Sequence, residues 1–309
     1  MTLSSSSPPA FSYAKYLASK ESIDARSLNR NVWDDFVSQL RGASQVLQVI
    51  ELGGGIGTTF KRIASQNLQA DLHYTLVDNE QENLDHFTSH VAEWMGEMQY
   101  QQEAALAWRN SVGSLVKVTP LLKDVHHLLA DKAAKGKWDW MIAQAFLDLF
   151  DIEDFLSPLL SLLRPGGLFY FPINFDGITS FLPTMSPELD AHVESIYHDS
   201  MDARATQPTL KGHSQSGRLL LSEILRLKHE ILSAGASDWI IHPVNGTYIQ
   251  SDQFFLGQML HFVESELKKS NEIDNDVADD WLKKRRQQLN SGELIFLAHQ
   301  IDVLGRVSD

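Results

Sequence analysis

The chain contains no cysteine in 309 residues. This absence excludes disulfide bonds, thiolate zinc sites and catalysis by a cysteine nucleophile. Positive charge is also scarce, because 26 lysine and arginine residues stand against 40 aspartate and glutamate residues, for a net charge of −14. Since nucleic-acid binding needs a basic surface to meet the phosphates, we expect no nucleic-acid partner.

Long apolar runs are missing as well. No uncharged stretch approaches the roughly 18 residues that a membrane-spanning helix needs. The first ten residues, MTLSSSSPPA, have neither the basic region nor the apolar region of a signal peptide. We therefore expect a cytoplasmic protein without a membrane partner. The chain is long enough to bury a substantial hydrophobic core.

A glycine-rich turn stands between a strand-like and a helix-like segment. Residues 46–57 read VLQVIELGGGIG, TTFKRIASQNLQ follows, and a second apolar run, LHYTLVD, ends at Asp78. Glycine lets the backbone approach a ligand closely because it has no Cβ. An acid at the end of the next strand suits ribose hydroxyls. The unit therefore predicts a pocket for a ribose-bearing cofactor.

The glycine spacing separates two classes of cofactor. The dinucleotide fingerprint G-x-G-x-x-G/A would place Thr58 or Phe60 at its third glycine position, and neither fits. The pattern present, E-x-G-x-G-x-G, resembles motif I of class I S-adenosylmethionine (SAM) dependent methyltransferases. In that family the acid at the position of Glu51 lies near the methionine amino group, and the acid at the position of Asp78 holds the ribose. The resemblance implies SAM as cofactor, and the implied binding residues are Glu51, Gly53, Gly55, Gly57, Asp78, Asn79, Asp124 and Gln144.

The residues that follow the later strands allow two interpretations. Asp124 stands where the family often places a polar residue facing the adenine amino group, but an aspartate that caps a helix fits the sequence equally well. Gln144 and Asp148 follow the fourth expected strand, whose end lines the methyl-transfer site in the family. A helix cap is again the alternative for Asp148.

Strands that alternate with helices predict βαβ units and a parallel sheet. We expect helices over 80–108, 151–163 and 219–235, and strands at 46–51, 72–77, 115–118, 138–143, 168–173, 238–243 and from residue 293 onward. The segment LRPGGL (163–168) is similar to the turn before the fifth strand of the family. The predicted fold class is α/β, a seven-stranded, mostly parallel, doubly wound sheet of the class I methyltransferase type with an N-terminal helical lid and a helical insertion after strand 5.

Two segments lie outside this core pattern. We expect residues 1–41 to form an N-terminal segment and helical lid, and residues 42–309 to form the SAM-binding domain, with the insertion 176–217 as a substrate lid. Long insertions after parallel strands lie over the ligand crevice and often bind ligands. The alternatives are a solvated N-terminal helix and an Asx turn after the fifth strand. The predicted substrate contacts are Tyr13, Tyr16, Arg26, Asn174 and Arg218.

The predicted activity is methyl transfer to a small molecule, because the chain is acidic and carries a large helical lid. His198, His213 and Asp148 are the candidates for proton transfer, although a loop histidine is often merely solvated. His192 and His198 are six residues apart, a poor spacing for one helix face, so we expect no metal site.

The acceptor atom stays open between oxygen, nitrogen and carbon. No N/D-P-P-Y/F motif follows the fourth strand, where the chain reads A-Q-A-F, and this disfavours amino-group methylation of adenine or glutamine. The alternative functions are a methyltransferase that acts on tRNA or protein, and a non-catalytic binding module that retains the SAM fold.

Overall fold

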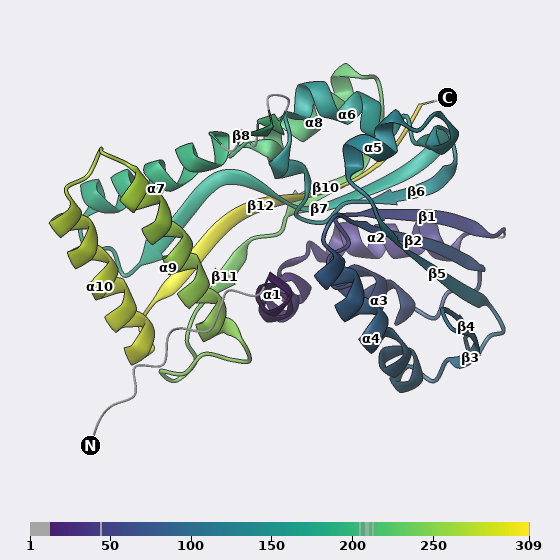
Figure 1. Ribbon diagram of the computed structural model, residues 1–309, viewed down its shortest axis with the longest axis horizontal. Helices are drawn as coiled ribbons and strands as arrows, with labels where there is room; N and C mark the ends of the chain where they lie inside the picture. Colours follow the sequence, from purple (N-terminus) through teal and green to yellow (C-terminus); the bar gives the residue numbers. More distant parts are fainter. Residues whose placement is uncertain (1–12, 44, 204, 208–209, 212, 309) are drawn as a thin grey trace.

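The computed structural model describes residues 13–43, 45–203, 205–207, 210–211 and 213–308. Within these residues a ten-stranded sheet has the order β10-β12-β7-β6-β1-β2-β5-β4-β3, with β11 paired to β12, and β8 pairs with β9 separately (Figure 1). The first twelve residues of the predicted N-terminal segment lie outside the described ranges. The strands are β1 (Leu47–Leu52), β2 (Leu72–Asp78), β3 (Gln101–Ala104), β4 (Ala107–Arg109), β5 (Leu115–Leu122), β6 (Trp138–Ile142), β7 (Leu163–Leu182), β8 (Ala205–Gln207), β9 (Leu210–Lys211), β10 (Glu230–Ala236), β11 (Trp239–Ile241) and β12 (Ile295–Arg306).

Seven of these strands form the predicted sheet. β5, β2, β1, β6 and β7 pair in parallel, and β12 lies antiparallel between β7 and β10. The predicted fold class is therefore confirmed, and β3, β4 and β11 are additional strands. The chain places β2 and β5 on one side of β1 and then places β6 and β7 on the other side. The strand order therefore reverses between β1 and β6, and open α/β sheets bind ligands at such a reversal point.

The helices cover both faces of the sheet because successive strand residues point to opposite sides. Val49 and Trp140 pack with α2, α3 and α4, whereas Ile50 and Met141 pack with α5, α6 and α8. Figure 1 shows these two layers on either side of the strands. The helices are α1 (Tyr13–Ser27), α2 (Arg30–Arg41), α3 (Thr58–Ala64), α4 (Gln81–Glu97), α5 (Val125–Ala130), α6 (Ile152–Leu160), α7 (Pro187–Asp202), α8 (Ser216–Arg226), α9 (Asp252–Lys269) and α10 (Asn275–Ser291), with short 3₁₀ turns at Lys132–Ala134 and Leu147–Leu149.

A third hydrophobic cluster lies beyond the parallel strands. β7 and β12 are long, and they stay paired from Leu168 opposite Arg306 to Leu182 opposite Ile295. The outer part of this ribbon packs with α7, α9 and α10 around this cluster of buried apolar residues (Figure 1). The predicted insertion 176–217 thus begins as a continuation of β7 and becomes α7, while the α9–α10 pair was not predicted.

Two expected helices are too long, and one expected strand has another place. The helix predicted over 80–108 ends at Glu97, and the helix predicted over 219–235 ends at Arg226 and is followed by β10. The sixth strand of the sheet, expected at residues 238–243, is therefore β10, which pairs with the inner part of β12. Residues 239–241 form β11 and pair with the outer part of β12. Gln99 and Lys228, which follow the two helix ends, both have φ of 63°. Residues other than glycine seldom adopt this conformation, so the residue types did not mark these ends.

The N-terminal segment divides between the sheet and its ligand crevice. Val32, Phe36 and Leu40 of α2 are buried in the same cluster as β1 and β2. α2 therefore belongs to the layered core, and α1 is the helical part of this segment that lies over the crevice (Figure 1).

Candidate functional site

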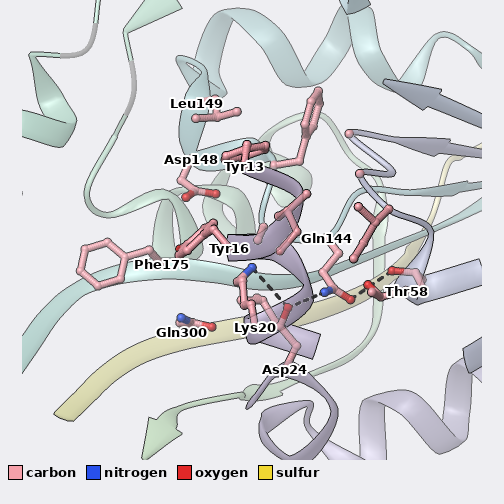
Figure 2. Close-up of a pocket in the computed structure, with 18 of the residues that line it drawn as sticks. Tyr13, Tyr16, Lys20, Asp24, Thr58, Gln144, Asp148, Leu149, Phe175 and Gln300 are labelled. Atoms are coloured by element: carbon pink, nitrogen blue, oxygen red, sulfur yellow. Dashed lines mark hydrogen bonds and ion pairs between the residues drawn. The ribbon is translucent and has the colours of Figure 1, made fainter. Parts of the chain in front are cut away.

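A cavity of about 480 Å³ opens at the carboxyl ends of β1, β2 and β6. Its glycine-turn half is lined by residues at or just after the ends of these strands, among them Glu51, Gly53, Gly55, Asp78 and Gln144. Its aromatic half lies against β7, β11, β12, α7 and α9, with side chains that include Phe175, Tyr197, Trp239, Phe262 and Phe296. α1 crosses the cavity and contributes side chains along its length (Figure 2).

The turn after β1 depends on glycine at the wall of the cavity. Gly53 and Gly55 have φ of 60° and 53°, in the left-handed region. A Cβ on Gly53 would lie 2.4 Å from the Phe146 ring, and one on Gly55 would lie 3.0 Å from Leu17 Cδ1 of α1. Gly57 also has a positive φ, but it packs on Phe87 and does not line the cavity. Backbone therefore approaches the cavity closely at Gly53 and Gly55.

Asp78 holds the turn in place from the end of β2. One carboxylate oxygen accepts a hydrogen bond from the Gly55 backbone N–H at 2.7 Å. The other accepts from the Glu80 backbone N–H at 2.9 Å and from Asn83 Nδ2 at 3.1 Å. A carboxylate has two acceptor sites on each oxygen, so the oxygen that accepts from Gly55 keeps one site, and Asp78 lines the cavity.

Glu51 is a buried acid at the end of β1. The Tyr74 hydroxyl donates to its Oε2 at 2.7 Å. Burial raises the pKa of Glu51 to about 7, against the lowering effects of the Tyr74 and Thr59 hydrogen bonds and of Arg62. Near neutral pH the side chain therefore exists in both protonation states, and a cation placed beside it would favour the carboxylate.

A buried network around Asp24 attaches α1 to the strand ends. Asp24 accepts hydrogen bonds from Gln144 Nε2 at 2.9 Å and from Trp239 Nε1 at 3.1 Å, and it lies 3.2 Å from Lys20 Nζ. Gln144 in turn accepts from Thr59 Oγ1 and from Arg62. Burial raises the pKa of Asp24, while Lys20 and Arg62 oppose the rise. Figure 2 shows the contacts that join α1 to Gln144.

The structure brings most of the predicted cofactor residues together. Five of those at the ends of β1, β2 and β6, together with Asn79, line the cavity, as do the predicted Tyr13, Tyr16 and Asp148. Tyr16 stacks on Phe255 at a centroid distance of 5.8 Å. Asp124 lies outside the cavity lining and caps α5, where it accepts from the His126 backbone N–H at 2.8 Å. For Asp124 the structure therefore shows the helix-cap alternative.

Three predicted substrate contacts are engaged elsewhere. Arg26 forms an ion pair with the buried Asp252 at 2.6 Å. Arg218 forms an ion pair with Asp176 at 2.9 Å. Asn174 is fully buried and donates to the carbonyl oxygens of Phe171 and Ile301 at 2.7 and 2.8 Å. These three residues make contacts within the fold and do not line the cavity.

The two histidines predicted for proton transfer also lie outside the cavity lining. His198 packs beside Phe175 at a centroid distance of 5.4 Å, and burial lowers its pKa. His213 Nδ1 accepts from the Gln215 backbone N–H at 3.1 Å and lies 3.9 Å from Asp202. Of the three predicted proton-transfer residues, Asp148 is therefore the one that lines the cavity.

Sequence reasoning missed the far wall of the cavity. Phe296, Ala298 and Gln300 line it from alternate positions of β12. The alternation in IFLAHQ is a strand signal, but nothing in it shows which face meets a ligand. Met259 and Phe262 of α9 complete this wall, and they lie in a helix that the sequence did not reveal as part of a site.

Two further properties concern the described part of the chain as a whole. It contains no group of three or more histidine, aspartate or glutamate side chains arranged to hold a metal ion. Among the same residues, no helix has the length and apolar character needed to cross a membrane.

The strand order and the glycine turn at its reversal point define a class I methyltransferase fold. No protein-family model matches the chain, and no curated protein matches it. Among solved structures, it is similar to geranyl diphosphate C-methyltransferase from Streptomyces coelicolor A3(2), crystallised with Mg²⁺, geranyl diphosphate and S-adenosyl-L-homocysteine, with 10% identity over 99% of this chain and 89% of that chain and a TM-score of 0.43.

The chain is also similar to two other solved structures. The cyclopropane synthase MmaA2 from Mycobacterium tuberculosis aligns with 10% identity over 97% of this chain and 100% of that chain, with a TM-score of 0.45. A putative type II methyltransferase from Anaeromyxobacter dehalogenans aligns with 16% identity over 91% and 98% of the two chains, with a TM-score of 0.46. The strand order described above defines the fold of this chain independently of these similarities.

Proposed function

We propose that this protein transfers a methyl group from SAM to a small-molecule acceptor. The observation that carries the proposal is the convergence of Glu51, the Gly53–Gly55 backbone and Asp78 on one cavity at the strand-order reversal. This is the place and the set of groups that the motif resemblance implies for SAM.

The groups present suit this cofactor. SAM carries an ammonium group and ribose hydroxyls, which are donors, and the glycine-turn half offers the carboxylates of Glu51 and Asp78 as acceptors. Asn79 beside Asp78 adds a further polar side chain, and Phe146 adds apolar surface against Gly53. When bound, SAM would supply the methyl group on its sulfonium sulfur, and S-adenosylhomocysteine would be the leaving group when a nucleophile takes that methyl group.

The residues of this chain contribute alignment and exclusion of water. α1 roofs the cavity and is tied to β6 and β11 through Asp24. Holding two reactants in line contributes roughly 7–11 kcal/mol to lowering a barrier. If the nucleophile is a hydroxyl, a base must take its proton, and Asp148 is the predicted candidate that lines the cavity.

Cofactor choice is tested by calorimetry together with a glycine variant. The wild-type protein is expected to bind SAM and S-adenosylhomocysteine and not NADH. Gly55→Val is expected to abolish this binding, because its branched side chain would enter the space beside Leu17 at a φ of 53°. Gly113→Val is the matched control, since Gly113 also has a positive φ but has open space around its Cβ position. Tight NADH binding without SAM binding would overturn the proposal.

The two strand-end aspartates give a second test. Asp78→Ala is expected to weaken SAM binding at least about tenfold, because a charge-assisted hydrogen bond contributes about 1.5–3 kcal/mol. Asp124→Ala is the control, because Asp124 follows β5, the strand next to β2, but caps α5 outside the cavity. Its SAM affinity should equal that of the wild type. Equal effects of the two substitutions on SAM affinity would contradict the assignment of Asp78.

A further inference from the structure

The aromatic half of the cavity has a definite chemical character. Its surface is built from rings and a thioether on five separate elements, namely Phe175, Tyr197, Met201, Trp239, Phe262 and Phe296. Lys20 and Asp24 border it, but they form an ion pair with each other at 3.2 Å. Asp148 adds a carboxyl group to the lining. A negatively charged ligand would therefore meet an acid and no uncommitted cation among these bordering residues.

Two buried polar atoms interrupt this apolar surface. Thr179 Oγ1 and Gln300 Oε1 have no hydrogen-bond partner, and each residue is 2% exposed. Both residues line the cavity. An unsatisfied buried polar atom destabilises the folded state, and most buried polar groups in folded proteins have a hydrogen-bond partner. A ligand whose donor reaches these two oxygen atoms would supply the missing hydrogen bonds.

The pairing of β7 with β12 places these two atoms on one wall. Thr179 lies opposite Ala298, and Gln300 is two residues further along β12. Residues two apart on a strand point to the same face, and Phe296, Ala298 and Gln300 all line the cavity. The wall therefore presents an aromatic ring, a small residue and an amide in succession, with the threonine hydroxyl on the neighbouring strand.

We propose that the methyl acceptor is an aromatic molecule that carries no negative charge and has at least one hydrogen-bond-donating group, which lies against Gln300 and Thr179 in the aromatic half. This inference rests on the proposed function, since it takes the aromatic half as the acceptor site. The rings of the wall bury the apolar body of the acceptor molecule. Its O–H or N–H donates to Gln300 Oε1, and the Thr179 hydroxyl, which can both donate and accept, bonds to the same polar group. Burying a polar group without a partner disfavours molecules that lack the donor.

Three matched probes test this inference by calorimetry on protein saturated with S-adenosylhomocysteine. 2-Naphthol carries a hydroxyl donor, 2-methylnaphthalene has a methyl group in its place, and 2-naphthoate carries a negative charge. We expect 2-naphthol to bind at least about tenfold more tightly than 2-methylnaphthalene, and 2-naphthoate to bind more weakly than either. Equal affinities of the first two probes, strongest binding of 2-naphthoate, or no binding of 2-naphthol would overturn the inference.

The Gln300→Leu variant separates a ligand-binding role from a structural one. It is expected to abolish the preference for 2-naphthol while leaving S-adenosylhomocysteine affinity unchanged. Because leucine removes an unsatisfied buried oxygen, its Tm should equal that of the wild type or exceed it by about 2 °C. A fall of several degrees, with the preference for 2-naphthol retained, would show that Gln300 is satisfied within the fold and would refute its proposed role.

The two proposals fail in different ways. If S-adenosylhomocysteine does not bind but the unliganded protein still prefers 2-naphthol, the methyltransferase proposal fails and the chemistry of the aromatic half stands as that of a binding site. If S-adenosylhomocysteine binds and the probes show no preference, the acceptor inference fails and the proposed function stands.

Discussion

Asp24→Ala is expected to lower the free energy of unfolding by about 3–5 kcal/mol, the usual cost of removing one partner from a buried ion pair. The substitution leaves Lys20 buried without its counterion, since the side chains of Lys20 and Asp24 are 10% and 4% exposed. It also removes the acceptor of Gln144 Nε2 and of Trp239 Nε1. Burial raises the pKa of Asp24, which shows that burying this ion pair costs free energy. In the alanine variant the Lys20 charge stays buried and no carboxylate compensates it.

Denaturation in urea measures this effect, with Asp34→Ala as control. Asp34 is an exposed aspartate on α2, and its replacement should change the free energy of unfolding by less than about 0.5 kcal/mol. The double variant Lys20→Met, Asp24→Leu should be more stable than Asp24→Ala, because it removes both charges. Faster tryptic cleavage within α1 of Asp24→Ala would locate the loss at this helix. Equal stability of Asp24→Ala and wild type would disprove the role of Asp24 in fastening α1.

Glu51 is expected to make the protein less stable as the pH rises from about 4.5 to about 7. Burial raises the pKa of Glu51 from 4.5 to about 7, so in this interval the folded protein binds more protons than the unfolded chain. Stability then falls with rising pH. A shift of this size corresponds to about 3 kcal/mol, contributed fully below pH 4.5 and lost above pH 7.

Glu51→Gln removes this titration and isolates it from other buried acids. Asp302 and Glu194 also have raised pKa values, of about 6 and about 7, through burial, and both remain in the variant. The stability of Glu51→Gln relative to wild type should therefore increase by about 2.5 kcal/mol between pH 5 and pH 8 in urea denaturation. Parallel pH profiles of the two proteins would mean that Glu51 keeps one protonation state throughout.

The glycine-turn half of the cavity was predictable because its signals are local. Apolar periodicity marks β1 and β2, glycines mark a turn that needs positive φ at Gly53 and Gly55, and Asp78 ends the next strand. A parallel sheet then brings successive strand ends to one edge. Gly57 was grouped with the cofactor residues, yet it packs on Phe87, because a glycine required by packing is indistinguishable in sequence from one required by a ligand.

Charged residues were the least predictable part of the site. Arg26 and Arg218 suggested substrate contacts, but each is paired with a buried aspartate, 226 and 42 positions away in sequence. Burying a carboxylate is costly unless a partner compensates it, and the partner is chosen by tertiary packing. For the same reason, a strand-end aspartate such as Asp124 carried two equal interpretations until its contact with the His126 N–H was known.

The sequence by itself determined the fold class, the turn that would receive a ribose-bearing cofactor and the exclusion of cysteine chemistry, because each depends on residue type and short-range periodicity. Only the tertiary structure decided what lies opposite that turn. Thr179 and Gln300 reach the same cavity through the pairing of β7 with β12, and Trp239 donates to Asp24 across 215 positions. Contacts between such distant segments depend on how helices and strands pack around a shared core, and local patterns carry no information about that packing.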